Sequence, residues 1–236
     1  MTGAGQVSQM PADASVERLS FVGLYRVFVG PSELFEKLKN SPRVLVPYLV
    51  MGVVLVAYAF GVSDLLVSVQ LEALQEQGTQ LPPGFSTDSL KYTGIATVVV
   101  FGLLTPLVAS WLALFLGNFI MAGRATFKQL LSVMLYGEII YVTGLLVHLP
   151  MILFKNTLLV TLSLAAILPN PDPSSPVWVG LSKFGFFNIW EIIVVGIGLS
   201  VVFGFSRNKG YTLAVLSIGL LSILHVITTA VGSAFG

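Results

Sequence analysis

Five long apolar stretches limit what this chain can fold into. A helix needs roughly 20 mostly apolar residues to cross a membrane, and that length is reached at residues 44–69, 93–121, 130–154, 184–205 and 211–235. Only 10% of the residues are charged, whereas a soluble domain has about 25%. So few charges do not cover a water-facing surface. The sequence therefore predicts an all-α bundle of five transmembrane helices over residues 43–236, in an integral, multi-pass membrane protein.

The positions of the basic residues predict the orientation of the bundle. Segments rich in Lys and Arg remain on the cytoplasmic side of a membrane. If the N-terminus is cytoplasmic, the cytoplasmic segments contain nine of the twelve basic residues, and the outer segments contain only Lys91, Lys155 and Lys183. We therefore expect a cytoplasmic N-terminus and a C-terminus on the outer side.

Three segments lie outside the expected spans. Residues 1–18 are mostly small and polar, which predicts a disordered cytoplasmic tail. Residues 19–42 predict an amphipathic juxtamembrane helix, with Pro31 at its start and Leu34, Phe35 and Leu38 on one face. It would lie on the inner membrane surface or pack beneath the bundle. Residues 156–168 are apolar but too short to span, so we expect an outer interfacial or re-entrant helix there.

Ionisable residues within the expected spans are candidates for function, because a charge at the bilayer centre costs about 2.5–3.5 kcal/mol on insertion scales. Glu138 falls roughly mid-membrane, Glu191 and His225 fall in the outer half, and Asp64 and His148 fall near the outer interface. A functional site would use Glu138, Glu191 and His225, with Tyr136 nearby, to bind a proton, a cation or a polar headgroup. The alternative is that each acid has a polar partner on a neighbouring helix.

Small residues predict close packing of the last two spans. Gly196, Ser200 and Gly204 recur every four residues, which lets helix backbones approach each other inside the bundle or in a homo-oligomer. The chain has no cysteine, and it contains no Walker loop, HExxH or GxSxG motif. We therefore expect no catalytic residue, no metal site and no cofactor. The net charge of +1 gives no indication of nucleic-acid binding.

Several segments, taken in order, resemble one family. They are VFVGPSELFEKLKNSPRVLVPYLV, then GRATFKQLLSVMLYGEIIYVTG with its Tyr136–Gly137 step, then LSLAAILP followed by FFNIWEIIVVGIGLSVVFGFSRNKG. The chain is similar over these segments to bacterial members of the Yip (Ypt-interacting protein) domain family. The resemblance implies five helices, a cytoplasmic N-terminus and a bacterial inner membrane location. Eukaryotic members act with Rab GTPases and carry a DLYGP-type motif, which this sequence lacks.

Two functions follow from these observations. The favoured one is a non-catalytic membrane scaffold or accessory protein, which contacts lipid and another integral membrane protein through its helices. The resemblance implies an ATP-binding-cassette exporter as one class of partner, with membrane trafficking or organisation as the other setting. The alternative is a channel or transporter that moves a proton, a cation or a small solute past Glu138 and Glu191.

Overall fold

The described part of the chain is predominantly helical and has no β-strand, as the sequence predicts. The computed structural model describes residues 12–235 except 77, 79–80, 82–83 and 170–174. Its α-helices are α1 (Ala12–Val29), α2 (Pro31–Asn40), α3 (Leu45–Gly61), α4 (Ser63–Glu76), α5 (Thr87–Phe115), α6 (Phe127–Lys155), α7 (Pro176–Ser182), α8 (Phe186–Phe203) and α9 (Arg207–Phe235). Of the predicted disordered tail, residues 1–11 lie outside the described part, and residues 12–18 belong to α1.

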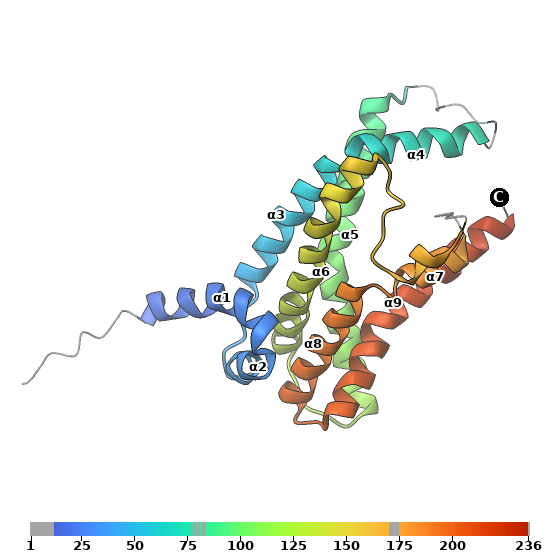
Figure 1. Cartoon of the computed structure of the whole chain (residues 1–236). Coiled ribbons are helices and arrows are strands. Elements are labelled where there is room, and N and C mark those ends of the chain that lie inside the picture. Colours follow the sequence, from blue (N-terminus) through green and yellow to red (C-terminus); the bar gives the residue numbers. More distant parts are fainter. Residues whose placement is uncertain (1–11, 77, 79–80, 82–83, 170–174, 236) are drawn as a thin grey trace, which may run out of the picture.

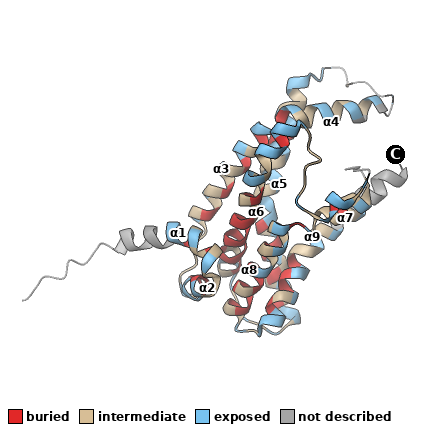
Figure 2. Ribbon diagram, viewed as in Figure 1, coloured by how far each residue is buried: buried red, intermediate tan, exposed pale blue. Residues whose placement is uncertain are grey.

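Helix α6 is the centre of the bundle. It packs against α3, α5 and α8, while α9 packs along α8 (Figure 1). In its most apolar 18-residue window 67% of the residues are buried, compared with 22% for α5. Figure 2 shows the buried residues concentrated along α6 and on the sides of α3 and α8 that face it. The core is therefore built around one helix, and α5 borders it on one side only.

The expected number of spans is not confirmed. Within the described residues, three helices are long and apolar enough to cross a membrane, or four if the bent pair α3 and α4 counts as one span. The predicted span over residues 44–69 consists of two helices, because the chain bends by 55° between α3 and α4, and the pair together is long and apolar enough to count as one broken span. The Ser63 hydroxyl donates to the Phe60 carbonyl at 2.9 Å at this bend, where α3 ends at Gly61. The fifth span, expected within α9, remains a prediction.

Helix α2 packs against the end of the bundle. Leu34, Phe35 and Leu38 are at most 1% exposed, and α2 lies against α8 and α6. The Lys39 ammonium also donates to the Val201 carbonyl of α8 at 3.0 Å. The amphipathic pattern of α2 is thus used for packing onto the spans themselves.

The expected helix over residues 156–168 is present only as a single 3-10 turn, Leu164–Ile167. Helix α6 ends at Lys155 and is followed by the capping residue Asn156, whose backbone is left-handed with φ 50°. After it the chain runs without regular structure, and Ser163 pairs with Gly185 in an isolated antiparallel bridge. The Ser163 hydroxyl accepts a bond from the Ala165 amide at 3.2 Å. Side-chain and bridge hydrogen bonds of this kind compete with helix formation.

Candidate functional site

The structure brings Glu138 and Glu191 together inside the bundle. Glu138 lies mid-way along α6 and is 8% exposed, and Glu191 lies in the second turn of α8 and is 6% exposed. The Glu191 Cγ atom is 3.7 Å from the position that a Cβ on Gly137 would occupy. The two carboxyl groups are close enough to interact electrostatically. We call Glu138 and Glu191 the acidic pair.

Tyr141 adds a polar side chain to the acidic pair, and Tyr58 lies next to Tyr141. Tyr141, one turn further along α6, interacts electrostatically with both carboxyl groups and with Tyr58 of α3. Within the part of the chain that the structure describes, neither carboxyl group accepts a hydrogen bond from a protein donor. Two carboxyl groups can hold one proton between them, but they supply few of the six to eight oxygen ligands that Ca²⁺ takes. Among described residues, no group of three or more acidic or histidine side chains could hold a metal.

The other two predicted site residues are placed differently. The Tyr136 side chain is fully buried, and it lies where α1 crosses α6. A Cβ on Gly23 of α1 would come within 2.8 Å of its ring. Tyr136 therefore supports the docking of α1. His225 lies in α9, and its side chain is outside the part that the structure describes.

Glycines let α6 and α8 approach closely on both sides of the acidic pair. A Cβ on Gly137 would collide with Val195 Cγ2, and a Cβ on Gly144 would lie 2.6 Å from the Phe187 ring. On α8, a Cβ on Gly198 would lie 2.5 Å from Val133. Contacts this short require the absence of a side chain, so these glycines set the spacing between the two helices.

The predicted small-residue stripe on α8 is used in two ways. A Cβ on Gly196 would collide with the Tyr211 ring of α9, and one on Gly210 would lie 2.7 Å from Ser200 Cβ. Gly196 and Ser200 thus line the contact between α8 and α9. Gly204 instead ends α8 in a left-handed conformation with φ 70°, which glycine adopts without strain, and a Cβ there would meet nothing within 4 Å.

Basic residues gather at the end of the bundle where α2 packs, which we call the basic end. Its described members are Arg26, Lys37, Lys39, Arg43, Arg124, Lys128, Arg207 and Lys209. Arg207 holds three parts of the fold together there. Its Nη1 donates to Ser200 Oγ at 3.1 Å and to the Ile197 carbonyl at 3.3 Å, and its Nη2 donates to Ser32 Oγ of α2 at 3.0 Å.

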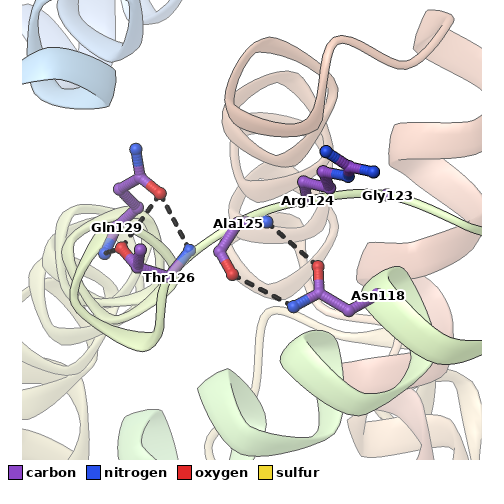
Figure 3. A pocket seen from close by; sticks show the side chains of 6 residues that line it. All are labelled: Asn118, Gly123, Arg124, Ala125, Thr126 and Gln129. Carbon is purple, nitrogen blue, oxygen red and sulfur yellow. Dashed lines mark hydrogen bonds between the residues drawn. The ribbon is translucent and has the colours of Figure 1, made fainter.

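The turn between α5 and α6 forms a hollow of about 360 Å³ at the basic end (Figure 3). Asn118 holds this turn with two 3.0 Å bonds, one from the Ala125 amide and one to the Ala125 carbonyl. Thr126 and Gln129 form a capping box at the start of α6, and Gln129 Nε2 donates to the Lys39 carbonyl at 2.7 Å. Most polar groups that line the hollow therefore serve the turn itself.

Residues 25–230 match the Yip1 domain. The chain belongs to the Yip1 domain family. It is also 29% identical to the membrane protein YknW of Bacillus subtilis (strain 168) over 226 residues, which is 90% of this chain and 92% of that relative. No solved structure matches the chain. The resemblance read from the sequence is confirmed, and the chain is a multi-pass membrane protein of this family.

The structure gives physical roles to the Tyr136–Gly137 step of this Yip1 domain. Tyr136 faces α1, while Gly137 brings α8 next to α6. The following residue, Glu138, then lies beside Glu191. Sequence reasoning did not include Tyr58, because a single tyrosine in an apolar helix carries no signal that it lies near Tyr141 of another helix.

Proposed function

We propose that this Yip1 domain is a non-catalytic accessory protein that binds another integral membrane protein through its spanning helices. Membership of the Yip1 family and the similarity to a bacterial membrane protein support this class of function. An ATP-binding-cassette exporter is the partner that the resemblance to bacterial members implies. Membrane lipid is its other contact.

The observation that carries the proposal is the outer face of α5. This helix and the π-helical turn after it form the longest apolar helix described, Thr87–Ile120, yet few of its residues are buried within the chain. Large side chains along it are exposed, among them Phe101 at 67% and Trp111 at 61%. A face of this length and width accommodates a partner helix by side-chain packing, which drives association inside membranes.

The polar residues support the same function. The Asn118 amide bonds within the α5–α6 turn. The Arg207 guanidinium bonds to α2 and α8. These groups stabilise the contacts between helices, as expected of a protein whose role is to present a rigid helical surface.

Site-specific photocrosslinking in native membranes tests the proposal. A photoreactive phenylalanine analogue at Phe101 or at Trp111 is expected to form an adduct with one integral membrane protein, identified by mass spectrometry. The matched control is Met51, which is fully buried and should give no intermolecular adduct. Adducts with lipid alone, or only with a second copy of this chain, at both exposed positions would contradict the proposal.

A second function is kept because the structure places Glu138 beside Glu191. Under this hypothesis the acidic pair passes a proton or a cation across the bundle. Purified protein in proteoliposomes would then show a flux that disappears in Glu138→Gln and in Glu191→Gln. An absence of flux in the parent protein would exclude it.

A further inference from the structure

We propose that His148 is a pH-sensitive tether that fixes the segment of residues 156–168 to α6 and releases it in acid. His148 lies near the end of α6 opposite the basic end. Its Nε2 accepts a hydrogen bond from the Leu162 amide at 3.1 Å, and its Nδ1 lies 2.7 Å from the Gly144 carbonyl one turn earlier.

These two contacts determine the protonation state of the ring. The Leu162 amide can only donate, so Nε2 must carry a lone pair and no proton. The Gly144 carbonyl can only accept, so Nδ1 must carry the hydrogen and donate it. The observed geometry therefore requires the neutral imidazole with its proton on Nδ1.

Protonation removes this tether by direct replacement of an acceptor with a donor. When Nε2 gains a proton it points an N–H at the Leu162 N–H, and the hydrogen bond is lost. Histidine is the side chain whose charge normally changes between pH 5 and 8. The sequence predicts His148 near the outer interface of the membrane, where water is close, and Leu162 beside it is 44% exposed, so a change of pH at that surface would reach the ring.

Loss of the tether affects the start of α8 because the backbone of Leu162 and Leu164 also bonds to residues at the entry of that helix. Its carbonyl accepts a bond from the Phe186 amide at 3.3 Å, and the Leu164 amide donates to the Phe184 carbonyl at 3.3 Å. The His148 ring also makes an edge contact with Phe187 of α8, with centroids 6.2 Å apart. The segment thus joins the end of α6 to the entry of α8, and its release frees that connection.

Titratable groups other than His148 lie on α6 and on the parts of the chain beside it. Residues 157–168 contain no titratable side chain. The titratable residues on α6 nearest to His148, and those on the helices and connections beside that part of α6, are Glu138, Tyr141, Lys155, Lys183, Glu191, Tyr58, Asp64, Asp88, Lys91 and Tyr92. Glu138 and Glu191 are the buried acids among these, so each needs its own control.

Hydrogen exchange of the Leu162 amide tests the proposal in detergent-solubilised full-length protein. After correction for the intrinsic exchange rate, protection of this amide should fall roughly twofold to tenfold between pH 7.5 and pH 5, the range of one net hydrogen bond. The Ala125 amide is the internal control, because it is held by the non-titrating Asn118 at 3.0 Å. Its protection should not change with pH.

Three variants assign the effect. His148→Gln keeps an acceptor for the amide but does not titrate, so Leu162 protection should become independent of pH. Glu138→Gln and Glu191→Gln should each leave the acid response intact. Unchanged protection in the parent protein, an acid response that persists in His148→Gln, or one that disappears in Glu138→Gln or in Glu191→Gln would each overturn the proposal.

A spectroscopic measurement covers the case in which His148→Gln does not fold. The chain has only two histidines, so nitrogen-15 histidine labelling with a His225→Gln variant gives a single imidazole signal. The Nδ1–H tautomer is expected at neutral pH, with conversion to the charged ring in acid. An Nε2–H tautomer at neutral pH would refute the tether.

Discussion

Replacing Gly137 by alanine should destabilise the contact between α6 and α8. The added Cβ would collide with Val195 Cγ2, and Val195 is fully buried, so the two helices must move apart. Overpacking of this kind costs about 1–3 kcal/mol, and the better helix propensity of alanine offsets up to about 1 kcal/mol. We expect a net loss of about 1–2 kcal/mol in the free energy of unfolding, measured by reversible denaturation in mixed micelles.

A matched control and a second substitution make this prediction specific. Gly52→Ala lies in the interior of α3, where the new Cβ would make an ordinary 3.7 Å contact with Leu103, so its stability should be unchanged or slightly higher. Val195→Ala removes the colliding methyl group, so the double variant Gly137→Ala/Val195→Ala should recover at least about 1 kcal/mol relative to additivity. Equal stabilities of the Gly137 and Gly52 variants, or strict additivity in the double variant, would refute the reasoning.

Two further predictions concern the basic end and the acidic pair. Arg207→Gln should lower the free energy of unfolding by about 1 kcal/mol and expose α2 to protease, because the bonds to Ser32 and Ser200 are lost. The control is Lys209→Gln, which removes only a cation 5.6 Å from the Phe205 ring. Equal cleavage of the two variants would contradict this prediction. The Glu138→Gln variant should fold with nearly unchanged thermal stability. The Glu138→Lys variant buries an unpaired cation, so it should lower the yield of folded protein in fluorescence-detected size exclusion. A normal yield of the lysine variant would show that the site is open to water.

The apolar length of the spans made α5, α6 and α8 predictable to within a few residues at most ends. The bend after α3 was not, because residues 62–69 remain apolar enough to extend a span. What ends α3 is local: the Ser63 hydroxyl bonds to the Phe60 carbonyl, and Gly61 lies against Leu149 of α6. Such a contact depends on the fold and leaves no periodic signal.

The candidate site was predictable in part. Glu138 and Glu191 could be selected because a carboxyl group in an apolar span is costly. Depth counted along the sequence did not place them beside each other, since that pairing depends on how α8 is set against Gly137. The segment over residues 156–168 shows the reverse case, in which an apolar composition favours a helix but the bond from Leu162 to His148 holds an irregular chain.

The measurement that tests the central claim most directly is the composition of the protein extracted from native membranes in polymer-bounded lipid particles. Mass analysis of the intact particles is expected to find this Yip1 domain in fixed stoichiometry with a second integral membrane protein. Substitution of Phe101 and Trp111 by alanine should reduce that stoichiometry, while Gly52→Ala should not. Particles that contain only this chain and lipid, at native expression levels, would contradict the account.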